Sequence, residues 1–211
     1  MSRGPRFPVS NKRSTLPGVG QLSFFSADAR GPRVADLAGP LCGPGQAVSF
    51  GRGTAARVSA VVPDRWRADA LLAACAERGV EAEIATSDEG SPLVRTAVRA
   101  DLVPLAAGWL RGAVKAVPPD FELDGPVLRL WALVAGRAVP GGYLMGLDPH
   151  APDTHRSLAA TLARAGLPAT LVGPRGGGPG LRVSGRRRLG RLVELVGGPP
   201  AGCGPEDWPV T

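Results

Sequence analysis

Both histidines of the chain lie in one short run, DPHAPDTH, which also contains two aspartates. Asp148, His150, Asp153 and His155 are residue types that could ligate a metal or act as an acid and base pair. A structural alternative exists for each of them. Asp153 precedes a helical pattern and can serve as its N-cap, and the prolines around His150 favour a turn. We favour the structural interpretation and expect no metal or other cofactor here.

Other catalytic arrangements are missing from the sequence. Cys42, Cys75 and Cys203 are odd in number and widely spaced, so they indicate neither a disulfide framework nor a zinc site. The glycine-rich stretch from Gly173 to Gly180 lacks the Lys-Ser/Thr pair of a phosphate-binding loop and is typical of a long hairpin tip. No Gly-x-Ser-x-Gly motif accompanies them. Hydrolase chemistry based on a side-chain nucleophile is therefore not supported.

Positive charge is the main compositional signal. The 211-residue chain has a formal net charge of +7, and its positive side chains are almost all arginine. The planar guanidinium pairs well with phosphate and with base edges, which makes a nucleic acid the leading partner. A GC-rich genome is the alternative explanation, because it raises arginine content without any ligand. The sequence has neither an apolar run of membrane-spanning length nor a signal peptide, which predicts a cytoplasmic protein.

The chain contains an internal repeat. LLAACAERGVEAEI, residues 71–84, aligns with LAATLARAGLPATL, residues 158–171, at a shift of 87 positions. The same shift continues without a gap as far as Trp109 over Val196. Each copy has the pattern of a strand, a helix, two alternating strands and a second helix, and a further helical segment lies upstream. The register predicts a duplicated domain of helices and strands.

The two upstream segments resemble the paired helices of LAGLIDADG homing endonucleases. In copy one the motif is LAGPLCGPG, residues 37–45, and in copy two VAGRAVPGG, residues 134–142, which aligns Gly39 with Gly136. The resemblance implies an α+β fold of two tandem αββαββα repeats, with a saddle-shaped antiparallel sheet packed by helices. We expect repeats at residues 33–116 and 117–198, and a monomer whose two copies form an internal pseudo-dimer.

The resemblance also implies where catalytic acids would stand. In this family the acid precedes the last glycine of each motif and holds a divalent metal, and the residues at those places are Pro44 and Gly141. Neither can ligate a hard cation, which needs carboxylate oxygens. The resemblance therefore implies DNA binding without cleavage, as in regulators of the WhiA type, and no enzyme activity. The alternatives are a WhiA-like transcription regulator and a divergent endonuclease that uses acids such as Asp36 or Asp148.

Arginines recur at equivalent positions of the two copies. Strand alternation places Arg95 and Arg99 on one face of PLVRTAVR, and Arg182 and Arg186 on one face of GLRVSGR. Such faces could meet the phosphates and groove edges of double-stranded DNA, or they could simply mark the solvent side of a sheet. The candidate DNA contacts are Arg52, Arg57, Arg95, Arg99, Arg175, Arg182, Arg186, Arg187 and Arg188.

The N-terminal residues 1–32 have the composition of a disordered basic tail, and residues 199–211 that of a flexible C-terminal tail. Within the first tail lies QLSFF, which resembles the peptide that binds bacterial replication and repair proteins to the DNA polymerase sliding clamp (beta subunit). Its residues are Gln21, Leu22, Ser23, Phe24 and Phe25, with Phe24 in place of the usual leucine.

A peptide of this kind presses its apolar side chains into a preformed pocket of its partner. The alternative is that Leu22, Phe24 or Phe25 packs onto the protein's own domain. The whole sequence thus predicts a non-catalytic, nucleoid-associated DNA-binding protein that the sliding clamp recruits during DNA replication or repair.

Overall fold

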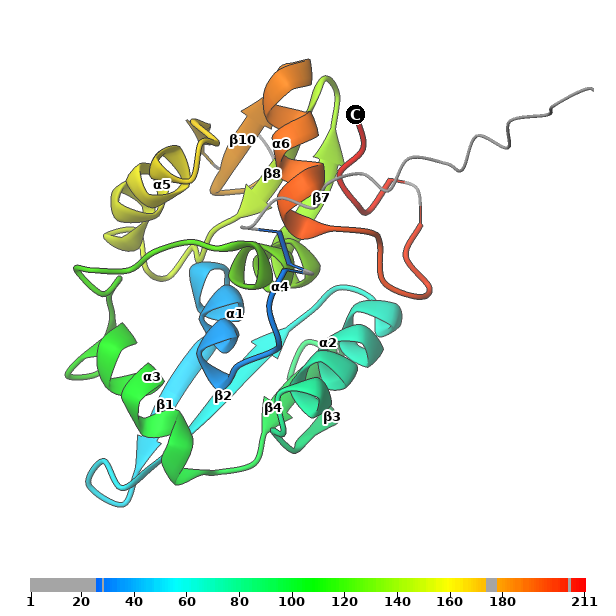
Figure 1. Cartoon of the computed structure of the whole chain (residues 1–211). Helices are drawn as coiled ribbons and strands as arrows, with labels where there is room; N and C mark the ends of the chain where they lie inside the picture. Colours follow the sequence, from blue (N-terminus) through cyan, green and yellow to red (C-terminus); the bar gives the residue numbers. More distant parts are fainter. Residues whose placement is uncertain (1–25, 28, 174–177, 205) are drawn as a thin grey trace, which may run out of the picture.

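The two halves of the chain have the same order of elements in the computed structural model, which describes residues 26–27, 29–173, 178–204 and 206–211 (Figure 1). The first half comprises the 3-10 helix η1 (Val34–Leu37), α1 (Ala38–Cys42), β1 (Gln46–Phe50), β2 (Ala55–Val61), α2 (Arg65–Glu77), β3 (Ala82–Thr86), β4 (Pro92–Thr96), the 3-10 helix η2 (Ala100–Leu102) and α3 (Val103–Trp109). The second half comprises α4 (Gly125–Ala135), β7 (Gly136–Val139), β8 (Gly142–Gly146), α5 (Thr154–Arg164), β9 (Thr170–Val172), β10 (Gly180–Ser184) and α6 (Arg186–Val196). A short hairpin follows α3 and consists of β5 (Leu110–Arg111) and β6 (Val114–Lys115). The predicted α+β fold of two tandem repeats is confirmed.

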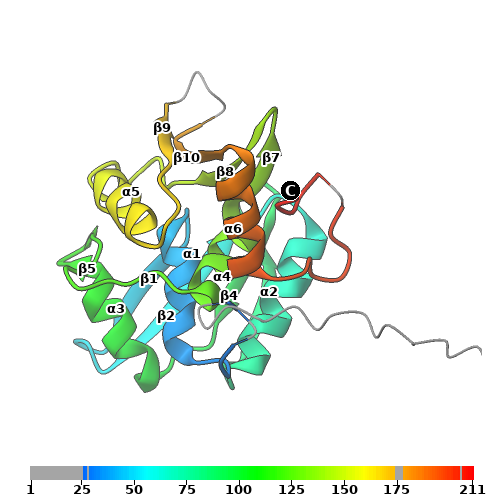
Figure 2. The same cartoon turned by 45° about the horizontal axis from the view of Figure 1, so that its top comes forward.

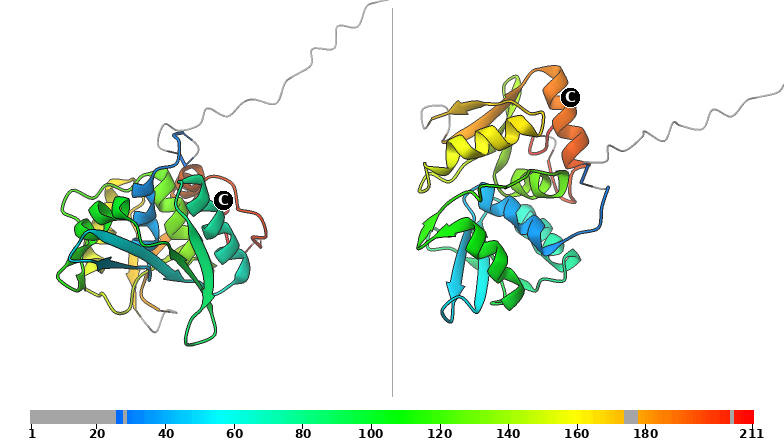
Figure 3. Two further views of the ribbon diagram at one scale, coloured as in Figure 1. Left: turned by 90° about the horizontal axis from the view of Figure 1, so that it is seen from below. Right: turned by 60° about the vertical axis from the view of Figure 1, so that its left-hand side comes forward.

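Each half contains one four-stranded antiparallel sheet. The strand orders are β1-β2-β4-β3 and β7-β8-β10-β9, so the two sheets have matching topology. Alternate side chains of β2, among them Ala56, Val58 and Ala60, are buried on the side that packs against the helices. Figure 3 shows the two halves one above the other, with α1 and α4 between them. No helix in the described part of the chain has the length and apolar character that crossing a membrane requires.

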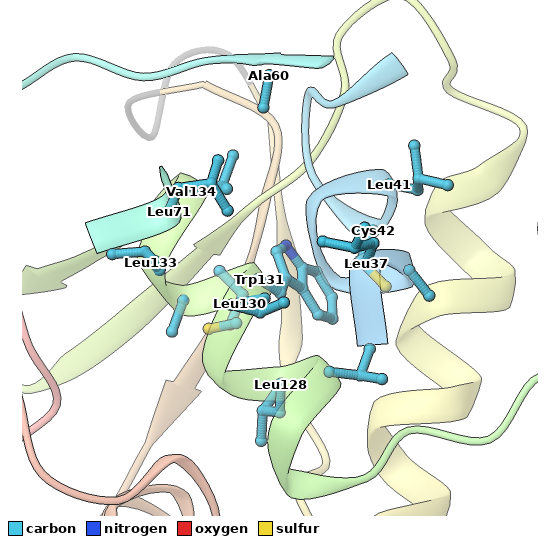
Figure 4. Close-up of a cluster of buried hydrophobic side chains, with 14 of the residues drawn as sticks. Leu37, Leu41, Cys42, Ala60, Leu71, Leu128, Leu130, Trp131, Leu133 and Val134 are labelled. Atoms are coloured by element: carbon cyan, nitrogen blue, oxygen red, sulfur yellow. The ribbon is translucent and has the colours of Figure 1, made fainter. Parts of the chain in front are cut away.

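Helices α1 and α4 pack against each other at the centre of the molecule (Figure 2). Gly39 permits this contact, because a Cβ atom at that position would lie 2.5 Å from the carbonyl oxygen of Val127 and 2.6 Å from the Cβ atom of Leu130. Buried side chains of both helices, including Leu41 and Trp131, surround the contact and form one core shared by the two halves (Figure 4).

The second motif lies in a different place from the predicted one. Helix α4 ends at Ala135, and Gly136–Val139 forms strand β7, so residues 136–142 of the predicted motif are not helical. Gly141 occupies the turn between β7 and β8, with a φ of +70°. The prediction that Gly141 stands at the place of the catalytic acid in a motif of residues 134–142 was wrong, because a sequence rich in alanine and glycine contains several similar short matches.

Strand pairing gives the correct alignment of the two motifs. Gln46 on β1 and Arg137 on β7 are equivalent, because each is joined through the next strand to one of the two equivalent arginines of β4 and β10. Counting back from these residues, Pro44 corresponds to Ala135. Alignment of Gly39 with Gly136 was therefore wrong as well, and copy two has a shorter first hairpin than copy one.

The C-terminal segment packs onto the second half. The side chain of Trp208 is only 3% exposed. The backbone N–H of Ala138 on β7 donates a hydrogen bond of 3.2 Å to the carbonyl oxygen of Glu206. The expectation of a free tail over residues 199–211 is thus corrected, since one tryptophan buried against the fold outweighs a composition typical of a tail.

Replacing Gly39 with alanine is expected to lower the free energy of unfolding by about 1–3 kcal/mol, because the new methyl group overlaps atoms of α4. Gly190→Ala is the matched control, since a Cβ atom there meets only Thr211 Cγ2 at 3.8 Å. Within α6 this control is expected to be neutral or to stabilise by up to about 1 kcal/mol. Urea denaturation measures both variants, and equal losses would contradict the argument from close packing.

Candidate nucleic-acid interface

The first sheet presents one face away from its buried side. Residues with side chains on this face are Gln46, Val48 and Phe50 of β1, Arg57 and Ser59 of β2, and Arg95 of β4; we call them outer face 1. Val48 pairs with Arg57, and Ser59 pairs with Arg95, so the arginines lie on neighbouring strands. Two predicted arginines therefore share one partly apolar surface.

The two arginines of outer face 1 have different surroundings. The Arg57 guanidinium lies over the Phe50 ring, 5.8 Å from its centroid, and its Nε atom is buried with no hydrogen-bond partner among the described residues. Arg95 donates a hydrogen bond of 2.7 Å from Nε to the Glu83 carboxylate, in a pair that remains open to solvent. Arg57 thus keeps unused hydrogen-bonding capacity, whereas Arg95 is held by a surface ion pair.

The second sheet has an equivalent face, outer face 2, defined by Arg137, Leu144 and Arg182. Leu144 pairs with Arg137 on one side and with Arg182 on the other, and both arginines are exposed. Arg182 Nη2 donates a hydrogen bond of 2.5 Å to the carbonyl oxygen of Pro140. Sequence analysis found Arg182 but missed Arg137, which the misplaced motif had assigned to a helix.

Arg99 lies outside these faces. Strand β4 ends at Thr96, and Arg99 pairs with Ala56, whose side chain is on the buried side of the sheet. The Arg99 side chain donates hydrogen bonds of 2.9 and 2.6 Å to Asp101, and this hydrogen bonding raises the pKa of Arg99. The prediction that Arg99 shares the face of Arg95 was wrong, because the regular alternation stops with the strand.

The arginines near the end of β10 also leave the sheet. The strand ends at Ser184, and Gly185, with a φ of +91°, turns the chain into α6. Arg186, Arg187 and Arg188 form the exposed first turn of that helix, so Arg186 does not share the face of Arg182 as predicted. Arg52 lies in the exposed β1–β2 turn with a φ of +59°, and Arg175 lies outside the described residues.

The ends of α1 and α4 meet between the two halves. A Cβ atom at Gly43 would lie 3.1 Å from the Cβ atom of Ala135. The equivalent residues at these ends are Pro44 and Ala135, so neither contributes a carboxylate. Instead the ammonium group of Lys115 lies at the end of α1, where Nζ donates hydrogen bonds of 2.6 and 2.7 Å to the carbonyl oxygens of Gly43 and Gly45.

Comparison with known proteins supports an assignment of the fold. Neither a protein-family model nor a curated protein matches the chain. Among solved structures, the homing endonuclease I-WcaI bound to its DNA recognition sequence superposes with a TM-score of 0.58 and 11% sequence identity, over 77% of this chain and 79% of that chain. The chain has a homing-endonuclease-like fold. At this identity the likeness concerns the fold alone.

A buried ion pair joins the two halves of the homing-endonuclease-like fold. Lys115 Nζ also donates to Asp148 Oδ2 at 3.0 Å, and both side chains are nearly inaccessible. Asp148 accepts further hydrogen bonds from Gln46 Nε2 at 2.7 Å and from the His150 backbone N–H at 2.9 Å. Asp148 from the second half is thus held by Lys115 and Gln46 from the first.

The pKa values of this pair are set by opposing effects. Burial by itself raises the pKa of Asp148, but the Lys115 charge and the hydrogen bonds to the carboxylate outweigh it, so the pKa is lowered. Burial lowers the pKa of Lys115, and the Asp148 charge offsets this only in part. Sequence analysis missed Lys115, although one signal was available: it is one of only two lysines in a chain that uses arginine elsewhere.

The histidine run forms a turn before α5. His155 Nε2 lies 2.8 Å from the backbone oxygen of Asp148, and the Thr154 hydroxyl donates to the Ala151 carbonyl oxygen at 2.7 Å. Asp153 stands at the N-cap position as predicted, but its side chain makes no cap hydrogen bond. Among the described residues no three His, Cys, Asp or Glu side chains are grouped to hold a metal ion.

The two acids named for a divergent endonuclease lie at opposite ends of α1. Asp36 is fully buried in η1, before the helix, where Arg30 Nη2 lies 2.6 Å from Oδ1 and Arg78 lies 3.1 Å from Oδ2. Asp148 lies beyond the other end, beside Gly45. The helical segment between them is on the order of 10 Å long, so the two carboxylates cannot share one metal ion.

Replacing Asp148 with asparagine is expected to lower the free energy of unfolding at pH 7 by about 3–5 kcal/mol, because Lys115 stays buried without a counter-charge. The lowered pKa means that the carboxylate stabilises the fold above its unfolded value of about 3.9 and that this contribution disappears as the pH falls through the folded value. The difference in free energy of unfolding between the native protein and the variant should therefore become smaller as the pH falls from about 5 to about 2.

Urea denaturation at several pH values measures this difference. The control is Glu83→Gln, which removes the exposed partner of Arg95 and should change stability by less than about 1 kcal/mol at pH 7. If the difference in free energy of unfolding between the native protein and Asp148→Asn did not depend on pH, the assignment of Lys115 and Asp148 as a charge pair would be contradicted.

Proposed function

We propose that this chain is a non-catalytic DNA-binding protein that holds duplex DNA against outer faces 1 and 2 and is recruited to the sliding clamp by its N-terminal arm. The observation that carries the proposal is the pair Arg95 and Arg182. These arginines occupy equivalent positions on the two sheets, in a fold similar to that of a protein solved on its DNA recognition sequence.

The outer faces have the chemistry that a duplex requires. Arg57, Arg95, Arg137 and Arg182 can contact phosphates, and apolar side chains such as Val48 on the same surface suit sugars and thymine methyl groups. The surface is therefore equipped for backbone contacts with limited reading of bases.

The first turn of α6 adds positive charge beside the second sheet. Arg186, Arg187 and Arg188 stand at a helix N-terminus, where the helix dipole disfavours cations. Their position therefore does not stabilise the helix, whereas an anionic backbone next to it would be attracted by both the arginines and the dipole. We include them in the proposed DNA contacts, as secondary members.

The proposal that DNA is bound without cleavage rests on the ends of the central helices. Pro44 and Ala135 cannot ligate a metal, and Asp36 and Asp148 are buried in ion pairs with cationic side chains. The structural neighbour is itself an endonuclease, so metal-dependent cleavage is the second candidate function. Nicking of supercoiled DNA by the purified protein with Mg²⁺ or Mn²⁺ would favour that second candidate.

The clamp-like peptide QLSFF, residues 21–25, lies outside the described residues, but its attachment point is defined. Ser26 is buried, and the Ala27 backbone N–H donates a hydrogen bond of 2.8 Å to the carbonyl oxygen of Leu195 on α6. Arg30 is paired with Asp124 at the start of α4. The arm thus begins on the helices, away from the outer faces, so one molecule could hold a clamp and DNA together.

Replacing Arg95 and Arg182 with alanine should weaken duplex binding and reduce the salt dependence of log K by about one per arginine that contacts a phosphate. Arg65→Ala is the control, because this arginine lies on α2, is paired with Asp69 and is 72% exposed. Fluorescence anisotropy over a series of salt concentrations gives both quantities. Loss of affinity in the Arg65 variant equal to that in the outer-face variants would indicate nonspecific charge effects.

Replacing Gln21 and Phe25 with alanine should abolish retention on immobilised sliding clamp, because these side chains would orient and anchor the peptide. Val9→Ala, elsewhere in the same arm, should leave retention unchanged. A pull-down with purified clamp compares the three proteins, and DNA binding measured in parallel should stay the same in all of them. Undiminished retention of the double variant would exclude recruitment through QLSFF.

A further inference from the structure

A groove lies between α4, α5 and α6, at the residue from which the N-terminal arm leaves the fold. Its volume is about 480 Å³, within the range of about 300–1,000 Å³ that is typical of binding pockets. The apolar part of its lining consists of Leu123, Pro126, Ala165 and Leu195, and Ser26 belongs to the same lining. The base of the arm therefore borders a mostly apolar groove.

The chain is anchored immediately after the arm. The Ala27 backbone N–H donates to the carbonyl oxygen of Leu195 at 2.8 Å, Arg30 pairs with acids on either side of it, and Ser26 is only 2% exposed. The end of the arm thus starts from a fixed point. The chain from Leu22 to Ser26 spans at most about 14 Å even when fully extended, so its side chains stay within reach of the groove.

The end of the arm carries side chains that such a groove accepts. Leu22, Phe24 and Phe25 lie outside the described residues and are clustered within residues 22–25 of the sequence. In an extended segment alternate side chains share one side, so Leu22 and Phe24 would lie on the side of Ser26, which lines the groove. Phe24 is also where the clamp-like peptide departs from the usual leucine, and an aromatic ring buries more apolar area in a groove.

Arginines in the lining of the groove suit an aromatic ring. Arg164 of α5 and Arg191 of α6 both contribute to it. Elsewhere in this chain guanidinium groups lie over the rings of Phe50 and Trp208, 5.8 and 5.2 Å from the ring centroids. A guanidinium can stack on a ring while its N–H groups keep partners in their own plane. The ring of Phe24 would therefore meet apolar walls and a cationic edge.

We propose that Leu22 and Phe24 dock in this groove and hold the clamp-like peptide in a closed state, from which the sliding clamp must release it. Attachment beside the groove gives an effective concentration in the millimolar range, so even a weak contact keeps the peptide docked for most of the time. Leu22 cannot fill the groove and the clamp at once, so the closed fraction lowers the apparent affinity for the clamp. The competition rests on the proposed clamp recruitment, whereas the docking does not.

Fluorine NMR of the full chain, labelled with 4-fluorophenylalanine, tests the docking without any clamp. The Phe24 resonance, assigned as the one lost in Phe24→Leu, should differ from its position in a synthetic peptide of residues 17–27. It should return to the peptide position in Ala165→Trp, whose indole fills the groove. Ala163→Trp is the matched control, because Ala163 is exposed on α5 and does not line the groove. A native Phe24 resonance at the peptide position would overturn the proposal.

The affinity for purified clamp tests the competition. Ala165→Trp should bind the clamp about tenfold more tightly than the native protein, because its arm is no longer held closed, and Ala163→Trp should bind as the native protein does. Equal affinities of all three proteins, with the Phe24 resonance released in Ala165→Trp, would overturn the competition. Absence of clamp binding in all three would contradict clamp recruitment, while the NMR result alone decides the docking.

The fluorine spectra also report whether the variants are folded. Phe50 and Phe121 lie within the fold, so their resonances should keep their native positions in both tryptophan variants. If Ala165→Trp does not fold, the comparison of the native protein with the peptide still decides whether Phe24 docks.

Discussion

The close approach of α1 and α4 is the constraint on which the rest of the molecule depends. Gly39 lets the backbone of one helix reach the backbone of the other, and the buried side chains around this contact belong to both halves. Because each sheet is packed against its own side of this pair, the helix contact also sets the relative orientation of the two outer faces. The binding of a duplex across both faces would therefore depend on the contact between α1 and α4, although the DNA would not touch these helices.

Two buried cations stabilise the ends of these central helices. The last carbonyl groups of a helix have no partner within it, and burial makes an unpaired carbonyl costly. Lys115 satisfies the end of α1, and Arg67 satisfies the end of α4, where it donates to Leu133 O at 2.8 Å and Gly136 O at 2.9 Å. Both cations come from the first half, so the duplicated structure is not symmetric in its chemistry.

The two proposed binding activities use separate sides of the fold. The arm is attached to α6 and α4 through Ala27 and Arg30, whereas the arginines lie on the sheet surfaces that the helices leave open. This separation follows from the duplicated topology, because each sheet has one side committed to the core and one side left for a partner. The segment of residues 110–124, which includes β5 and β6, joins the two halves in one chain.

The sequence alone determined the duplication, most of the order of helices and strands, and the buried side of the two strands that carry Arg95 and Arg182. These are local properties, because side-chain alternation and helix periodicity depend on neighbouring residues, and for this reason Arg95 and Arg182 could be assigned to the outward sides of their strands. Tertiary structure decided where those patterns stop. Arg99 and Arg186 left the predicted faces because their strands end earlier.

The fold also decided which residues far apart in the sequence are equivalent and which are in contact. The true equivalent of Pro44 is Ala135, and only strand pairing reveals it, since several alanine and glycine matches compete in the sequence. Lys115 and Asp148 come together across the two halves, and neither has a local pattern that specifies the other. Local spacing fixes which way a side chain faces along its own element, whereas charge pairing between elements depends on packing that only the folded chain supplies.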